Sequence, residues 1–239
     1  FLESVRDPDE FRRVARRGLE AGKPVVALKI GRSALGARAA LAHTGALVGD
    51  NAVIDAAFEQ MGVVRVRSLE DLILTAGLMA GLGGGLPGPR LGVVTPSGGA
   101  SEIIADRAED EGLVLPTFGA DTTRELQAIV PAFATVQNPL DVTGYVVIDR
   151  TLMRRSLEVV ARDPEVDFAV LLSELPRVPG NDPELTLTAY GDSARSVRGT
   201  AVPTVVLSTV LTDVTEYGRE VAQRTNFPHV VGGIEHGIS

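Results

Sequence analysis

Short apolar runs alternate along the chain with longer amphipathic segments. The apolar runs have the length and the Val, Ile and Leu content of buried strands. They occupy 24–31, 63–66, 90–96, 113–116, 167–174, 203–210 and 228–231. Segments with helical start signals lie between them, at 7–22, 51–62, 68–82, 97–112, 120–130, 150–164, 182–197 and 212–224. Strands that alternate with helices of this length predict an α/β fold with parallel, doubly wound sheets of flavodoxin-like or Rossmann-like type.

The segment 7–22 illustrates how the helix boundaries are predicted. Asp7 is a candidate N-cap, Pro8 follows at the first helical position, and Gly22 is a suitable C-terminal stop. The stretch around His43, with glycines at 45 and 49, predicts a loop, as does "NPLDVTG" at 138–144.

The sequence "GGGLPGPR" starting at Gly83 contains four glycines and two prolines, so it predicts a linker. We therefore expect a first domain at 1–82, a linker at 83–89 and a second domain at 90–239. "FLES" at the start resembles the end of a buried strand. We expect the first domain to be incomplete and the chain to be a piece of a longer polypeptide.

Composition narrows the function classes. The net charge of -8 argues against a general nucleic-acid or anionic-membrane surface. No apolar run is long enough to span a membrane. Without cysteine there is no disulfide framework and no cysteine metal site. The chain has only three histidines, which argues against a dedicated zinc site. We therefore expect no bound metal, no nucleic acid and no membrane partner.

Two stretches carry candidate chemistry. In "VVTPSGGASEII" a strand ends, Gly98 and Gly99 turn the chain, and a helix starts, so the unpaired amides and the helix dipole at this start could bind phosphate. A purely structural junction is the alternative. His43 is either an exposed loop histidine or a nucleophile that carries a phosphoryl group. Lys29, Arg32 and Arg38 precede it and could offset phosphate charge, or could be solvated surface residues.

The stretch "KPVVALKIGRSALGARAALAHTGALVGD" resembles the nucleoside-diphosphate-forming acyl-CoA synthetases, which are relatives of succinyl-CoA synthetase. The later "VVTPSGGASEIIADRAEDEGL" and "NPLDVTG" are similar to that family in the same order, so the resemblance covers nearly the whole chain. Two positions depart from the pattern: Ala42 stands where serine is usual, and Pro96 where asparagine is common.

The resemblance implies a role for each matching residue. His43 matches the histidine that is phosphorylated during turnover, and Glu3 matches a carboxylate that orients it. Ser97, Gly98, Gly99 and Ala100 match a helix N-terminus that binds phosphate. The implied reaction is reversible. It converts acyl-CoA, ADP and phosphate to carboxylic acid, ATP and CoA through an acyl phosphate and a phosphohistidine.

The resemblance also implies what other polypeptide must supply. The CoA-binding domain and the ATP-grasp domain are not in this chain, so they are expected in cis or in a partner subunit of an oligomer. CoA and ATP or ADP are expected as substrates. Mg²⁺ is expected to accompany the nucleotide, which binds outside this segment. We expect a cytoplasmic enzyme part that is inactive alone. The alternatives are a ligand-sensing or regulatory module of a protein acetyltransferase and a subunit-docking module.

Overall fold

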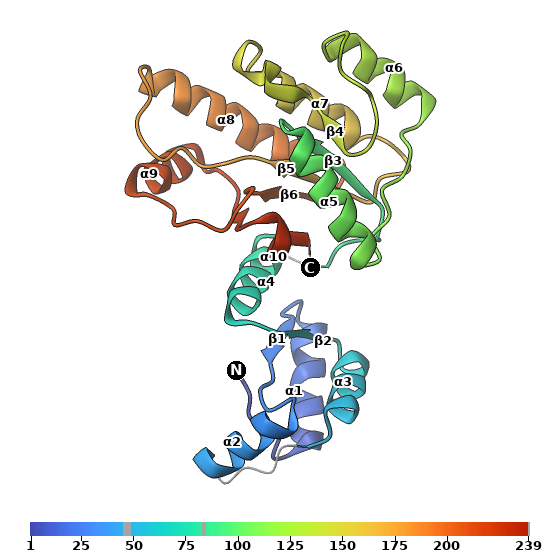
Figure 1. The fold of residues 1–239 in the computed structure, drawn as a ribbon, viewed down its shortest axis with the longest axis vertical. Coiled ribbons are helices and arrows are strands. Elements are labelled where there is room, and N and C mark those ends of the chain that lie inside the picture. The colour runs from blue at the N-terminus through green and yellow to red at the C-terminus, as the bar shows by residue number, and fades with distance from the viewer. Residues whose placement is uncertain (45–48, 83–84, 239) are drawn as a thin grey trace. The chain divides into compact units, whose positions relative to one another are not determined.

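The computed structural model describes residues 1–44, 49–82 and 85–238, with the side chains of 43 and 44 excepted. Contacts within the chain divide it into two compact units, Phe1–Gly85 and Leu86–Ser239 (Figure 1). The division falls inside the stretch predicted as a linker.

The first unit has a small parallel sheet. Its elements are α1 (Pro8–Glu20), β1 (Val25–Leu28), α2 (Ala34–Thr44), α3 (Asn51–Gln60), β2 (Val63–Val66) and α4 (Leu69–Leu82). β1 and β2 pair in parallel, with Val25 opposite Val63. Leu2 extends this sheet by one parallel bridge to Lys29, through backbone hydrogen bonds to Leu28 and Ile30. The strand-like character of "FLES" is therefore limited to one bridging residue.

The two faces of this sheet are covered differently. On one face Ala27 of β1 and Val63 of β2 form a core with Ala15 of α1 and Phe58 of α3. The ring of Phe58 stacks on Phe11, with centroids 5.6 Å apart. On the other face Val26 points toward α4, which has no fully buried residue although it is strongly apolar. Apolar burial in the described part of this unit is therefore concentrated under α1 and α3.

The second unit has a five-stranded parallel sheet of order β4-β3-β5-β6-β7. Its elements are β3 (Leu91–Thr95), α5 (Gly98–Asp110), α6 (Ala120–Ile129), β4 (Leu140–Asp141), a 3₁₀ turn η1 (Thr143–Val147), α7 (Leu152–Val160), β5 (Phe168–Leu172), α8 (Pro183–Gly199), β6 (Thr204–Leu207), α9 (Glu216–Thr225), β7 (Val230–Val231) and α10 (Ile234–Ile238). This is the 2-1-3-4-5 strand order of doubly wound flavodoxin-like folds, so the expected fold class is confirmed.

Helices cover both faces of this sheet, as a wholly parallel sheet requires. One face carries the main core, in which Val94, Leu171 and Val206 of the strands meet Leu126 of α6 and Leu157 of α7. α8 joins this layer through Ala194 and Val197. The opposite face is covered by α5 and α10, which contact each other (Figure 1). The strands β3 and β5 are buried at every position.

Three sequence predictions were wrong. The predicted loop around His43 is helical up to Thr44, because α2 spans Ala34–Thr44; residues 45–48 lie outside the described residues. The predicted loop 138–144 contains the edge strand β4 and the start of η1. The predicted strand 113–116 reduces to a single bridge between Val114 and Arg90.

Candidate functional site

The N-terminus of α5 lies at the position where open parallel sheets bind ligands. α5 follows β3, and the chain moves from β3 to β4 on one side and later to β5 on the other. The order of strands therefore reverses at β3. Ligands of doubly wound folds bind outside the carboxyl ends of strands at such a switch point.

Local hydrogen bonds leave a defined set of amides at this helix start. Ser97 is the N-cap, and its hydroxyl accepts a hydrogen bond from the Ala100 amide at 3.3 Å. The Ser97 amide in turn donates to Oγ1 of the buried Thr95, at 3.2 Å. In the described part of the chain, the amides of Gly98 and Gly99 have no such acceptor, and both residues are exposed. Of the four predicted phosphate-binding residues, these two glycines offer donors.

A carboxylate borders the same helix start. Asp141 ends β4, and a Cβ atom on Gly98 would lie only 3.2 Å from its Oδ2. The other oxygen, Oδ1, accepts a hydrogen bond from the Thr143 amide at 2.8 Å, which stabilises Thr143 at a φ of 62°. Asp141 thus makes an Asx turn. Its position beside α5 was not predicted. It follows from the pairing of β4 with β3, and β4 has only two residues, which is too short to detect in the sequence.

Asn138 holds the neighbouring strands in place. Its Oδ1 accepts from the Val93 amide at 3.1 Å, and its Nδ2 donates to the carbonyls of Leu91 and Pro116 at 2.8 and 3.1 Å. The following peptide bond to Pro139 is cis. Asn138 therefore supports β3 directly.

The first unit contains the two residues predicted to be catalytic. The backbone of His43 belongs to the last turn of α2, and its side chain lies outside the described residues. Glu3 is half-buried and follows Leu2, the residue that bridges to Lys29 at the carboxyl end of β1. Glu3 thus lies beside the strand end from which the chain continues toward α2. Contact between Glu3 and His43 stays a prediction.

Two cations lie inward at the carboxyl end of this sheet. Lys29 is only 2% exposed and donates a hydrogen bond to the carbonyl of Ile30. Burial, and then the nearby charge of Arg65, lower the pKa of Lys29. Arg65 of β2 bonds to Asn51 and Asp55, which are both on α3. Sequence reasoning missed Arg65, although an arginine within the apolar run "VVRV" was a visible signal.

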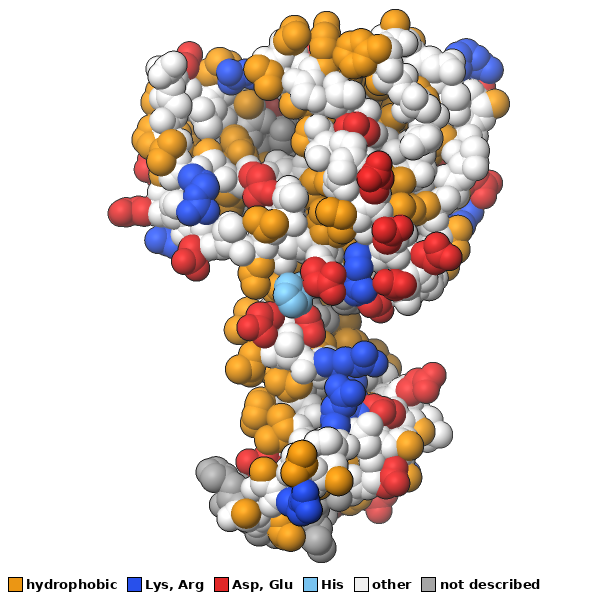
Figure 2. Space-filling view, in the orientation of Figure 1, with side chains coloured by type: hydrophobic (Ala, Val, Ile, Leu, Met, Phe, Trp, Pro, Cys, Tyr) orange, Lys and Arg blue, Asp and Glu red, His pale blue; other side chains and the backbone are white. Residues whose placement is uncertain are grey.

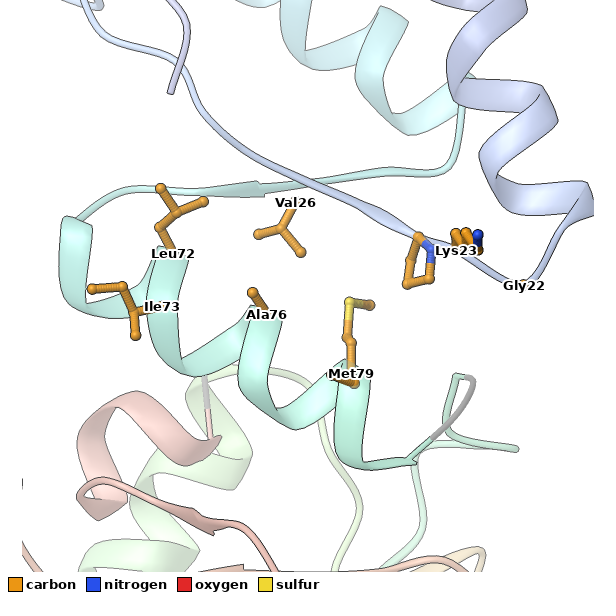
Figure 3. Close-up of a pocket in the computed structure, with 9 residues that line it drawn as sticks. Gly22, Lys23, Val26, Leu72, Ile73, Ala76 and Met79 are labelled. Carbon is orange, nitrogen blue, oxygen red and sulfur yellow. The ribbon is translucent and has the colours of Figure 1, made fainter. Parts of the chain in front are cut away.

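A cavity of about 690 Å³ opens between β1 and α4 (Figure 3). Leu72, Ala76 and Met79 project from α4 toward Val26, whereas Ile73 lies at the edge of the cavity and is mostly exposed. The lining also includes Gly22, Lys23, Pro24 and Ala80. Hydrophobic side chains also gather on the outer surface over α4, where Leu69 and Ile73 are exposed (Figure 2). This is an apolar surface with a lysine at its rim.

The described residues lack two further features. They contain no group of three or more His, Asp or Glu side chains placed to hold a metal ion. None of their helices has the length and apolar content needed to cross a membrane.

Comparisons with known proteins agree with the resemblance. Residues 1–79 match the family described as the succinyl-CoA ligase like flavodoxin domain. Acetate–CoA ligase (ADP-forming) I of Archaeoglobus fulgidus is 35% identical over 172 residues, which are 72% of this chain and 24% of that protein. The alpha subunit of acetate–CoA ligase (ADP-forming) II of Pyrococcus furiosus is 32% identical over 184 residues, 77% of this chain and 39% of the subunit.

A solved structure supports the fold. The dinucleotide-forming acetyl-coenzyme A synthetase 1 of Ca. Korarchaeum cryptofilum, in complex with phosphate and ADP, superimposes with a TM-score of 0.77 at 24% identity. The match covers 99% of this chain and 50% of that chain. This chain thus spans half or less of each of these relatives. Residues 1–79 are a succinyl-CoA ligase-like flavodoxin domain, and the chain is homologous to part of the ADP-forming acyl-CoA ligases.

Proposed function

We propose that this chain is the part of an ADP-forming acyl-CoA ligase that carries a phosphoryl group on His43. The observation that carries the proposal is the succinyl-CoA ligase-like match over residues 1–79, which contains both His43 and Glu3. The Leu2–Lys29 bridge supports it, because it holds Glu3 at the sheet end from which the His43 segment departs.

The proposed reaction has three transfers. Inorganic phosphate attacks the acyl carbon of the thioester, the carbon–sulfur bond breaks, and CoA leaves. The His43 imidazole attacks phosphorus of the acyl phosphate, and the carboxylate leaves with the electrons of the broken phosphorus–oxygen bond. An oxygen of ADP then attacks the phosphohistidine and breaks its phosphorus–nitrogen bond, which gives ATP. Each step is reversible.

The protein groups have separate tasks in this scheme. Glu3 accepts a hydrogen bond from the imidazole, orients it and stabilises its positive charge while it is phosphorylated. The free amides of Gly98 and Gly99 stabilise anionic phosphate oxygens without a basic side chain. Binding of phosphate by backbone amides is compatible with the net charge of -8, because these amides take the place of a basic surface.

The remaining substrates are bound by other polypeptide. We propose that the ATP-grasp and CoA-binding domains lie in cis or in a partner subunit, and that this segment alone does not complete the cycle. The Pyrococcus relative is named an alpha subunit, which supports an oligomeric arrangement. CoA, ADP or ATP and Mg²⁺ enter as substrates through those parts, and we propose a cytoplasmic setting for this enzyme.

A docking role is a second candidate function. α4 is apolar, has no fully buried residue and leaves Leu69 and Ile73 exposed. Such a surface is typical of an interaction site. It is compatible with the ligase role, because a catalytic segment that depends on other domains must also contact them.

The test is to incubate the complete parent protein with γ-labelled ATP and Mg²⁺. We expect an alkali-stable, acid-labile label on His43 that ADP removes, and no label in His43→Asn. An unlabelled protein that is folded and binds nucleotide would contradict the ligase role and would favour the ligand-sensing module.

A further inference from the structure

Lys29 is an unusual residue for the interior of the first unit. Side chains alternate along a strand, so Lys29 shares a face of β1 with Ala27, which belongs to the core under α1 and α3. Lys29 is only 2% exposed, and its described hydrogen bond is to the neutral carbonyl of Ile30. A lysine ammonium has three donors and is rarely buried without a charged partner.

A second cation lies close to Lys29. Arg65 stands opposite Ala27 in the parallel register, on the same face of the sheet. Its guanidinium is held by Asn51 and Asp55, and its side chain is 13% exposed. Lys29 follows Ala27 by two residues on the same face of the sheet, and at this position the Arg65 charge lowers the pKa of the Lys29 amine. Asp55 compensates Arg65, but in the part of the chain that the structure describes no carboxylate forms an ion pair with Lys29.

This arrangement is unfavourable unless something compensates it. A buried ammonium loses hydration, and a like charge nearby raises its free energy further. An anion at the carboxyl end of the sheet would reverse both effects, since it would accept the remaining ammonium hydrogens and attract both cations. The carboxyl end of a parallel sheet is also where ligands of such folds bind.

We propose that Lys29, assisted by Arg65, binds a tetrahedral phosphate-class anion at the carboxyl end of the sheet of the first unit. The inference rests on the proposed function for its biological meaning, since a phosphoryl group has to be held near the His43 segment. It goes beyond that function because it assigns the binding of the anion to a buried lysine and a partly buried arginine. Lys29 is then a binding residue and Arg65 a positioning residue.

The sequence offers a clean probe, because Lys29 and the exposed Lys23 are the two lysines of the chain. Lysine labelled with ¹³C at Cε would give one NMR signal from each, assigned by Lys29→Met and Lys23→Met. Inorganic phosphate is titrated into the 239-residue chain at constant ionic strength, with ADP in a separate arm. We expect a saturable shift of the Lys29 signal and an unchanged Lys23 signal. Whichever of the two anions shifts Lys29 identifies the source of the phosphate.

The variants separate this inference from the proposed function. Arg65→Gln keeps a polar group opposite Asn51 and should weaken the saturable binding by about tenfold, the effect of losing one charged partner. In His43→Asn, which cannot be phosphorylated, the Lys29 shift should persist. If it persists while the parent protein takes no label, the phosphate site stands and the ligase role fails.

Other outcomes overturn the inference. If Lys29 does not respond, or if Lys29 and Lys23 shift together and linearly, the anion is not bound at Lys29. If Lys29→Met stays folded by thermal unfolding and removes no phosphate binding measured by calorimetry, Lys29 is a structural residue. Lys29→Arg should retain binding, because it keeps the charge.

Discussion

The carboxylate of Asp141 lies against the first residue of α5, so that a side chain at Gly98 would come within 3.2 Å of Oδ2. Strand β4 places a negative charge at the helix end where the free amides would bind phosphate. The two preferences oppose each other: the helix start attracts an anion, and Asp141 repels it. The affinity of this site for phosphate should therefore be limited by Asp141.

Asp141→Asn tests this balance. Asparagine can keep the Asx hydrogen bond to the Thr143 amide while the charge is removed. We expect affinity for inorganic phosphate at α5 to rise by about tenfold, the effect of removing a like charge at short range near the surface. Calorimetry on the chain carrying Lys29→Met isolates the α5 site. Unchanged affinity would show that phosphate does not approach α5.

Gly98→Ala should have the opposite effect. Its methyl group would crowd Asp141 and occupy the approach to the free amide, whereas a methyl group on Gly99 would have no neighbour within 4 Å. We expect phosphate binding at α5 to weaken in Gly98→Ala and to persist in Gly99→Ala. Calorimetry on the same background measures both, and equal behaviour of the two variants would refute the geometric argument.

Glu3→Gln should slow phosphorylation of His43 in the parent protein by about 100-fold or more. A carboxylate that orients a catalytic imidazole and stabilises its positive charge contributes a rate factor of about that size. The fold should be unaffected, since Glu3 is only half-buried and its neighbour Leu2 makes the backbone bridge. Rapid-quench labelling gives the rate, and circular dichroism checks the fold. A wild-type rate would make Glu3 merely structural.

The pair Arg90–Asp167 predicts how stability depends on pH. Hydrogen bonds from the Arg90 side chain and amide hold the pKa of Asp167 below its usual value. The folded-state pKa is thus below the unfolded one, so the contribution is present above about pH 4 and is lost as pH falls through the folded pKa. Asp167→Asn should flatten the acid limb of the unfolding free energy. Denaturant titrations between about pH 6 and 2 measure this; an unchanged acid limb would contradict it.

Gly92→Ala should destabilise the second unit. A Cβ there would lie 2.6 Å from Val160 and 3.0 Å from Val166, inside a fully packed strand. Overpacking of this kind costs roughly 1–3 kcal/mol. Gly199→Ala is the control, since a methyl at the end of α8 meets nothing within 4 Å. Chemical denaturation measures the free energy of unfolding of both variants. Equal values would show that the core around Gly92 accommodates a methyl group without cost.

Local signals made most elements predictable. Asp7 caps α1, Ser97 caps α5, and Thr215 caps α9 through side-chain hydrogen bonds. Buried β3 and β5 stand out as apolar runs. The missed helix α2 also had a local signal: Ser33 accepts a hydrogen bond from the Gly36 amide, and a run of good helix formers follows. The glycines at 45 and 49 nevertheless led to the prediction of a loop.

Other features depend on distant residues. β4 has two residues, and only its pairing with Val94 and Thr95 makes it a strand. Residues 113–116 look like a strand, but Val114 alone pairs, and the Asn138 side chain bonds the carbonyl of Pro116. The residues of the candidate sites also divide into those with a local sequence signal and those that depend on distant residues. The glycines of α5 could be predicted from a motif, whereas Asp141 beside them and Arg65 near Lys29 required the sheet registers.

The different burial of the two lysines has a practical consequence. The sequence contains no cysteine, Lys29 is enclosed, and Lys23 is exposed at the rim of the cavity between β1 and α4. Amine-reactive reagents will therefore modify Lys23 in preference to Lys29. A fluorophore attached there would report directly on any polypeptide that covers α4.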